Sequence, residues 1–228
     1  MKSILNLCLV CLCFCPEMFG QDTVRVNQTS DSSTVRWMRI AELPLDNPSF
    51  EDDTKCCTAP TGWIDCGEPG ETPPDVQPGY FSTDQQAIDG DTYLGMVVRD
   101  NSTQETISQL LTTPLELEKV YEFSITLAKS SRYISFSRIT GKEVNYGTPV
   151  VFQIYGGNKS CSKSELLAET GPISHTNWKE YTFRFSPKKN NYKYFILKAN
   201  YNPSAPSPYN GNLLLDDCSS IYEVMKIK

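Results

Sequence analysis

The feature that most constrains the fold is a period-two alternation of apolar and polar residues in short runs. In "VYEFSITLA", Tyr121, Phe123, Ile125 and Leu127 alternate with polar residues, as expected for a strand with one buried face. The runs "EYTFRFSP" and "KYFILKANY" alternate in the same way, and "TPVVFQIYGG", "GNLLLDDCSSI", "TYLGMVVRD" and "ETISQLLTTPL" are interpreted as further strands. Only "KSELLAE", residues 163–169, reads as a helical turn.

The turn-forming residues between these runs indicate the fold class. Short strands bounded by Gly, Pro, Asn and Ser, with 15 prolines and no long helical period, predict an all-β, two-sheet β-sandwich. We expect one domain over residues 44–228, after an N-terminal lead-in at residues 21–43 that is polar over residues 21–33. The Pro-rich loops 67–78 and 201–211 are expected at edges or mouths of the sandwich, where binding sites are often built.

The first twenty residues predict a secretory signal peptide. Lys2 precedes an apolar run from Ile4 to Phe14, which is shorter than the roughly 20 residues of a membrane span. We expect cleavage after Gly20, no transmembrane segment, and a secreted, periplasmic or cell-surface location. The net charge of −6 argues against nucleic acid as a partner, because such binding needs clustered Lys and Arg.

Five of the nine cysteines follow the predicted signal: Cys56, Cys57, Cys66, Cys161 and Cys218. An odd number in an exported chain leaves at least one thiol free or paired between chains. The span from Cys57 to Cys66 is ten residues long and contains a Pro and a Gly, so a local Cys57–Cys66 disulfide is predicted, with Cys56 as a competitor. Cys218 is expected to be a buried free thiol.

A series of motifs resembles one known group of folds. "NPSFE", "PTGW", "DGDTYLG", "NWKEYTFRFSP" and "NLLLDD" follow one another over roughly residues 44–221. Their order resembles the galactose-binding-like jelly rolls, which include carbohydrate-binding modules of bacterial glycoside hydrolases. The combination "ETPPD", "PVVFQIYGG" and "PYNGNLLLDD" is similar to exported bacterial envelope proteins that carry such a domain. The resemblance implies a jelly-roll fold, but a fold alone does not establish function.

The acidic stretch "LDNPSFEDDT" has two interpretations. The resemblance implies a structural calcium ion held by Glu51 and Asp216, with Asn47 nearby. Asp91 of the "DGD" turn is a further candidate ligand, because calcium takes six to eight oxygen ligands from carboxylates and backbone carbonyls. Phe50 is expected to point into the core. The alternative is that these acids are solvated turn residues, since Asp and Asn favour turns.

Loop tyrosines and arginines are the candidate ligand contacts. Tyrosine rings stack on sugar rings, and Arg binds hydroxyls or carboxylates with several donors. The candidates are Tyr80, Tyr133, Tyr146, Tyr201, Tyr209, Arg99 and Arg132. We favour Tyr201 and Tyr209, because the prolines of "YNPSAPSPYN" stiffen their loop, with Arg132 and Tyr133 across a groove. The alternatives are that Tyr201 closes the core and that the arginines are solvated strand ends.

The residue types do not suggest catalysis. His175 is the only histidine, and no Ser elbow or hydrolase motif accompanies it. A single histidine also argues against a zinc site, because no metal-ligand spacing with histidine exists. The sequence therefore predicts a non-catalytic exported module that binds a glycan or another cell-envelope component. The alternatives are a protein–protein interaction module of a surface or secretion assembly and, less favoured, a polysaccharide-degrading enzyme. Exposed tyrosines in a groove would favour the glycan, and an open strand edge would favour a protein partner.

Overall fold

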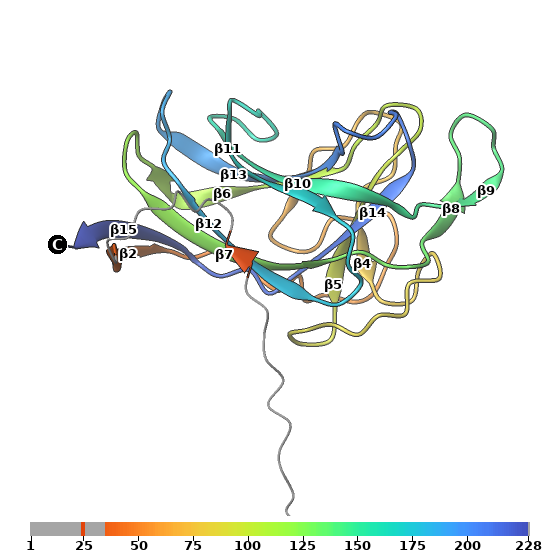
Figure 1. The fold of residues 1–228 in the computed structure, drawn as a ribbon, viewed down its shortest axis with the longest axis horizontal. Coiled ribbons are helices and arrows are strands. Elements are labelled where there is room, and N and C mark those ends of the chain that lie inside the picture. Colours follow the sequence, from red (N-terminus) through yellow and green to blue (C-terminus); the bar gives the residue numbers. More distant parts are fainter. Residues whose placement is uncertain (1–23, 26–34, 228) are drawn as a thin grey trace, which may run out of the picture.

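The structure is a computed structural model that describes residues 24–25 and 35–227, with side chains from residue 35 onwards. The predicted signal peptide lies outside the described residues. Figure 1 shows two packed layers of strands with a small hairpin projecting at one end. In the described ranges no helix is long and apolar enough to cross a membrane.

The first layer has the strand order β1-β12-β7-β14-β5-β4. These strands are β1 (Val24–Arg25), β12 (Lys179–Phe185), β7 (Tyr121–Ala128), β14 (Gly211–Asp216), β5 (Tyr93–Val98) and β4 (Asp75–Gln77). A two-stranded ribbon of β2 (Arg36–Leu43) and β15 (Ile221–Ile227) extends this layer, because β15 also pairs with the start of β7.

The second layer has the order β11-β10-β13-β6-β3. Its strands are β11 (Glu165–Ile173), β10 (Thr148–Gly157), β13 (Tyr192–Tyr201), β6 (Thr106–Leu115) and β3 (Ile64–Asp65). A short parallel pairing of β10 with β14 joins the two layers. The projecting hairpin consists of β8 (Ile134–Phe136) and β9 (Glu143–Asn145) (Figure 1).

The core lies between the layers and follows the alternation seen in the sequence. Phe123 of β7 packs edge-on against Phe195 of β13, with ring centroids 5.0 Å apart. Both side chains are fully buried, whereas Glu122 and Ser124 on the other face of β7 are only partly buried. Burial of such large apolar side chains contributes about 1.5–3 kcal/mol each. The predicted all-β sandwich is therefore confirmed.

The outer face of the first layer is also covered. Tyr93 and Val97 point outward from β5, yet both are buried. Trp178 packs edge-on against Tyr93, with ring centroids 5.3 Å apart. Val97 belongs to a second cluster with Tyr133 and Tyr146, which flank the hairpin. Side chains from other parts of the chain therefore cover the outer face of β5, so this face is not open to a ligand.

Two expectations about local structure need correction. "KSELLAE" does not form a helical turn, because Leu166 pairs with Tyr155 within the antiparallel β10–β11 ladder. A seven-residue helix is unstable alone, and here the edge of β10 offers hydrogen-bond partners instead. The lead-in predicted for residues 21–43 also contributes a strand, since β2 pairs with β15 from Arg36 to Leu43. In contrast, Phe50 is fully buried and packs on Trp63 at 5.5 Å, as predicted.

Candidate functional site

Loops from four parts of the chain meet at the end of the sandwich that carries the hairpin, and Asp100 joins three of them. Its carboxylate accepts hydrogen bonds from the Ser137 hydroxyl at 2.6 Å and from the Arg138 amide at 2.9 Å. The side-chain amide of Asn210 donates to the same carboxylate at 3.0 Å, and the Asp100 amide donates back to Asn210 at 2.9 Å. The β8–β9 turn and the Pro-rich loop 201–211 are therefore fixed to the loop after β5.

Glu71 ties the other Pro-rich loop, 67–78, to the same place. Its carboxylate lies 2.8 Å from Arg138 Nε and 3.3 Å from Arg99 Nε. Asn101 donates to it as well, at 2.6 Å. Burial acts to raise the pKa of Glu71, but the Arg138 and Asn101 hydrogen bonds and the charge of Arg99 outweigh it and hold that pKa below its ordinary value. Glu71 is therefore charged at neutral pH and links a buried guanidinium to a partly exposed one.

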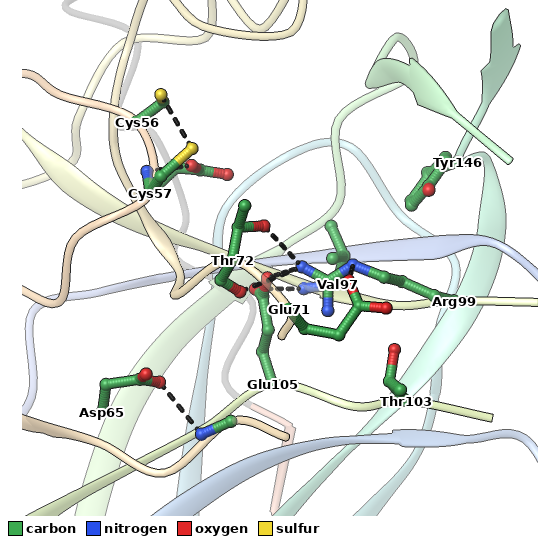
Figure 2. A network of polar contacts seen from close by, with 12 residues as sticks. Cys56, Cys57, Asp65, Glu71, Thr72, Val97, Arg99, Thr103, Glu105 and Tyr146 are labelled. Atoms are coloured by element: carbon green, nitrogen blue, oxygen red, sulfur yellow. Dashed lines mark hydrogen bonds and ion pairs between the residues drawn. The ribbon is translucent and has the colours of Figure 1, made fainter. Parts of the chain in front are cut away.

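Arg99 lies at the centre of this network rather than on the surface. Figure 2 shows its guanidinium directed toward Glu105 and Thr72, and only 3% of its side chain is exposed. Its Nη2 donates to Glu105 and, at 3.1 Å, to the carbonyl oxygen of Thr72. A buried charge needs such partners, because an isolated one costs several kcal/mol. The geometry thus makes Arg99 a structural residue.

The hairpin presents two apolar side chains to solvent above this network. Phe136 is 57% exposed and Ile139 is 69% exposed. Among the aromatic residues of the described part of the chain, Phe136 alone has an exposed ring. The backbone beneath it is well held: Tyr146 OH donates to the Phe136 carbonyl at 2.6 Å, and the Ser137 amide donates to Lys142 O at 2.9 Å. An exposed aromatic on an ordered backbone is a preformed stacking surface.

The hydroxyls of the tyrosines predicted as ligand contacts already form hydrogen bonds within the protein. Tyr133 is 2% exposed and donates to Asp75, and Tyr201 donates to the Arg99 carbonyl. Tyr209 donates to Pro149 O at 2.8 Å and accepts from the Asn202 amide at 2.6 Å. Tyr80 and Tyr146 likewise donate to backbone carbonyls, those of Thr54 and Phe136.

The structure brings only some of the predicted contacts together. Tyr201 and Tyr209 are half-buried and pack edge-on with ring centroids 5.2 Å apart, and Arg99 lies beside them. Tyr133 belongs to the separate cluster under the hairpin. Arg132 is exposed, and its backbone carbonyl accepts from Ser130 Oγ at 2.6 Å. This arrangement does not offer a row of tyrosine faces to a ligand, because the rings fill space between loops.

The acids predicted as calcium ligands surround one turn, residues 88–92. Asp216 accepts from the amides of Ile88 and Asp89 at 2.8 and 3.3 Å, and from Ser49 and the Asp217 amide at 3.0 and 2.8 Å. All four lone-pair positions of the Asp216 carboxylate are thus occupied by N–H and O–H donors.

Glu51 contacts the same turn in the same way. Its carboxylate accepts from the amides of Asp91 and Thr92 at 3.1–3.2 Å. Among residues 35–227, no cluster of three potential metal-ligand groups includes Glu51, Asp91 or Asp216. As arranged, Glu51 and Asp216 anchor the turn through its amides, and the Asp216 carboxylate offers no free lone pair of the kind that a calcium ligand must offer. The calcium site stays a prediction.

The predicted Cys57–Cys66 disulfide needs correction. Cys66 is bonded to Cys161, which lies 95 residues away in the sequence. The physical reason is that β3 pairs with β6, and Cys66 at its end then meets the loop between β10 and β11. Sequence spacing does not reveal this proximity. Cys218 is buried with a free thiol, as predicted. Burial raises its pKa well above the ordinary value, which keeps the thiol protonated.

Phe136 was missed by the reasoning from sequence. Its run, "YISFSRITGKEVNY", contains a signal for a hairpin, because "TGK" can turn between two short β-prone segments. A turn that carries an aromatic and an isoleucine beside Arg138 and Lys142 is unusual for a solvated loop. This combination could have indicated a contact surface.

Comparisons with known proteins agree with the fold. No family model and no curated protein match the chain. An arabinose-bound α-L-arabinofuranosidase matches with a TM-score of 0.50 and 12% identity, over 79% of this chain and 26% of that one. The adhesin domain K3 of Lys-gingipain from Porphyromonas gingivalis matches with a TM-score of 0.49 and 13% identity, over 80% of this chain and 100% of that one.

A xylan-binding domain from Paenibacillus barcinonensis matches with a TM-score of 0.42 and 15% identity, over 79% of this chain and 92% of that one. The chain therefore spans about a quarter of the arabinofuranosidase, and these identities show similarity of fold alone. The similarity of fold agrees with the β-sandwich predicted from the sequence, and membership of the galactose-binding-like group stays a prediction.

Proposed function

We propose that the chain is a non-catalytic, exported β-sandwich module that binds a glycan or another carbohydrate component of the cell envelope. The observation that carries the proposal is Phe136, the exposed aromatic on the β8–β9 hairpin, whose backbone is held by Tyr146 and Asp100. Sugar rings present an apolar C–H face that packs on an aromatic ring, while their hydroxyls bind polar groups at its edge. Arg138 and Lys142 on the same hairpin supply such polar groups.

The other parts of the proposal have separate support. Export rests on the charged start and short apolar run of the first twenty residues. A non-catalytic role is supported by His175, the chain's only histidine, whose ring nitrogens lie 2.8 Å from Tyr181 OH and from the Asn177 carbonyl. Neither contact is with a Ser, Cys or Thr side chain, the nucleophiles that a histidine base usually activates. The fold shared with part of an arabinose-bound enzyme chain is compatible with sugar recognition.

The test is a glycan array followed by titration of the best ligand into wild type and two variants. We expect millimolar to ten-micromolar affinity, about 4–7 kcal/mol, since a single stacked ring contributes modestly. Phe136→Ala should weaken binding about tenfold, which corresponds to about 1.4 kcal/mol. Leu110→Ala is the matched control, because Leu110 is 55% exposed on β6 in the other layer. Both variants should melt like wild type.

Two results would overturn the glycan proposal. The first is that no envelope polysaccharide or oligosaccharide binds wild type at millimolar concentration. The second is that Phe136→Ala and Leu110→Ala change affinity equally, because the hairpin would then have no special part in binding.

A specific observation favours a second candidate, a protein–protein interaction module. In the part of the chain that the structure describes, β2 pairs with β15 alone, so its other edge is open. Met38 and Ile40 of β2 and Met225 of β15 are exposed, at 45–48%. An open strand edge with apolar side chains can accept a strand from another protein. Loss of an envelope protein from pull-downs with Ile40→Lys, together with a negative glycan array, would favour this candidate.

A further inference from the structure

Cys56 and Cys57 are adjacent in sequence and are held as a pair against β4. Their Sγ atoms lie 2.8 Å apart (Figure 2). Lys55 exchanges two backbone hydrogen bonds with Val76, at 3.0 and 2.9 Å, and the Cys57 amide donates to Asp75 at 2.8 Å. The bend that carries both thiols is therefore fixed on each side of the pair.

The remaining cysteines leave this pair no other partner among the described residues. Cys66 and Cys161 are bonded to each other, and Cys218 is buried within the core. The other four cysteines of the chain precede Gln21, inside the predicted signal peptide. In an oxidising compartment two neighbouring exposed or half-exposed thiols form a disulfide. Both thiols of the pair are partly exposed and so can meet a small oxidant.

The arrangement does not suit a metal ion. Cys56, Cys57 and Asp75 have ligand atoms within 4.8 Å of one another, the spacing of a metal cluster. However, the two oxygens of Asp75 already accept hydrogen bonds, one from the Cys57 amide and one from Tyr133 OH. Two thiols are fewer than the three or four protein ligands of a tetrahedral site.

We propose that Cys56 and Cys57 form a vicinal disulfide, an eight-membered ring within the bend that lies alongside β4. A small-molecule disulfide is the oxidant. The Cys56 thiolate attacks one of its sulfurs and releases a first thiol, which leaves Cys56 in a mixed disulfide. The Cys57 thiolate then attacks the Cys56 sulfur and releases the second thiol. Two protein thiols and one small disulfide thus become one protein disulfide and two small thiols, whose sulfurs take up the two protons.

The order of attack follows from the surroundings of each thiol. Burial, the Cys56 hydrogen bond and the negative charge of Asp75 raise the pKa of Cys57 to about 12. Cys57 is therefore the poorer first nucleophile and reacts second, as the resolving thiol. In that step the short distance between the two sulfur atoms compensates for its small thiolate fraction. The φ of Cys57, 65°, is a backbone conformation that non-glycine residues rarely adopt. The hydrogen bonds of Lys55 and Cys57 to β4 hold the backbone in this conformation.

The bond should be labile. Adjacent Cα atoms are about 3.8 Å apart, below the 4.4–6.8 Å usual between bridged cysteines, and disulfides outside that range are strained and more reducible. The Cys66–Cys161 bridge, with Cα atoms 5.2 Å apart, falls within the usual range. The pair is thus a candidate redox-responsive site in a chain that also has a bridge of ordinary geometry. The expectation of an oxidising compartment rests on the proposed export, but the bond itself can be tested with purified protein.

The experiment equilibrates the purified full chain in glutathione buffers of increasing oxidised fraction, then alkylates it under denaturing conditions and digests it before Asp. Residues 53–64 form one peptide that carries Cys56 and Cys57 and no other cysteine, and Cys66 falls in the next peptide. In oxidising buffer the 53–64 peptide should be two hydrogens lighter than the dithiol and carry no alkyl group. In moderately reducing buffer it should carry two, while Cys66 stays bridged. In oxidising buffer Cys57→Ser should leave Cys56 as a mixed disulfide with glutathione, because the thiol that would resolve it is missing, and in reducing buffer it should leave one alkylated thiol at Cys56.

Three outcomes would overturn the proposal. One is that the 53–64 peptide carries two alkyl groups under conditions in which Cys66–Cys161 is formed. Another is that it is found linked to the peptide of Cys66, which is the local pairing predicted from the sequence. The third is a reducible dimer through Cys56 or Cys57. None of these depends on glycan binding, so the proposed function and the disulfide fail independently.

Discussion

The carboxylate of Asp100 lies against the Ser137 hydroxyl, at 2.6 Å, and this contact joins the loop after β5 to the base of the β8–β9 turn. The same carboxylate also accepts the Arg138 amide at 2.9 Å. A hairpin of two three-residue strands has little stability of its own. The exposed Phe136 therefore owes its fixed position in part to a residue outside the hairpin.

Replacing Asp100 should weaken the hairpin and, through it, ligand binding. We expect Asp100→Ala to lower the free energy of unfolding by about 1–3 kcal/mol, because buried donors lose their acceptor. Glycan affinity should fall several-fold, since a mobile turn must be ordered on binding. Hydrogen exchange at the Ser137 amide, which donates to Lys142 O, measures the loosening directly. Asp53→Ala, an exposed acid elsewhere, is the control, and equal exchange in both variants would contradict this role of Asp100.

The fold could be predicted from the sequence because alternation determines which face of a strand is buried. The prediction from sequence failed where the alternation is weak or ambiguous. β2, with the sequence RWMRIAEL, does not alternate strictly, and its pairing with β15 is what shows it to be a strand. The two leucines of "KSELLAE" suggest a helical turn, but the edge of β10 supplies a ladder that local sequence cannot reveal.

The site was harder to predict because a pattern within one strand does not show what covers it. Tyr133 and Arg99 end up buried because the hairpin and the loop 67–78 pack over the outer face of β5. A sequence can indicate that a tyrosine is in a loop, but not that another loop lies on top of it. The pairing of Cys66 with Cys161 is of the same kind, since it depends on how β3 meets the loop after β10.

The Cys66–Cys161 bridge should contribute strongly to stability. It links residues 95 apart, and the loss of chain entropy in the unfolded state predicts about 4–5 kcal/mol for a loop of that length. The double variant Cys66→Ser, Cys161→Ser should therefore unfold at clearly lower urea concentration than wild type, with a similar slope. Cys218→Ser is a poor control because Cys218 is buried, and Cys56→Ser would remove the proposed vicinal disulfide. Asp53→Ala is the control, because Asp53 is exposed and belongs to neither cysteine pair. An unchanged midpoint in the double variant would contradict the expected contribution.

Tyr209 should matter for stability and not for ligand binding. Its hydroxyl accepts the Asn202 amide and donates to Pro149 O, so Tyr209→Phe leaves two backbone groups without their partner. We expect a loss of about 1–3 kcal/mol in the free energy of unfolding and unchanged glycan affinity. Tyr194→Phe is the matched control, because the Tyr194 hydroxyl has no hydrogen-bond partner among the described residues. A loss of affinity at Tyr209 without a loss of stability would restore the sequence-based prediction of Tyr209 as a ligand contact.

Asp216 should contribute a decrease in the free energy of unfolding as the pH rises from about 4 to 6. Burial raises the pKa of Asp216 to about 6, from an ordinary value of 3.8, although four hydrogen bonds act in the opposite direction. The folded state then binds the proton more tightly than the unfolded state. The contribution of this carboxyl is therefore fully present below 3.8 and is lost as the pH rises through 6.

Urea unfolding at a series of pH values measures this dependence. The slope from one such group is at most about 1.4 kcal/mol per pH unit. Asp75, whose pKa burial also raises to about 6, adds a similar dependence, so the difference between Asp216→Asn and wild type isolates Asp216. The variant should show a flatter profile between pH 4 and 6. Parallel profiles would mean that Asp216 titrates alike in the folded and unfolded states.

Calcium provides the last test, because two interpretations of the same acids predict opposite results. If Glu51 and Asp216 share an ion, as the resemblance implies, calcium at a hundred- to thousand-fold excess over its dissociation constant stabilises the fold by about 3–4 kcal/mol. If these acids anchor the turn 88–92 through its amides, calcium has no free lone pair to bind on Asp216 and changes nothing. We expect the second result, with the melting temperature equal in calcium and in chelator. Asp216→Ala should then lower the melting temperature by the same amount in both. A rise with calcium in wild type that is absent from Glu51→Ala and Asp216→Ala would establish the calcium site and show that the ion displaces the amide hydrogen bonds.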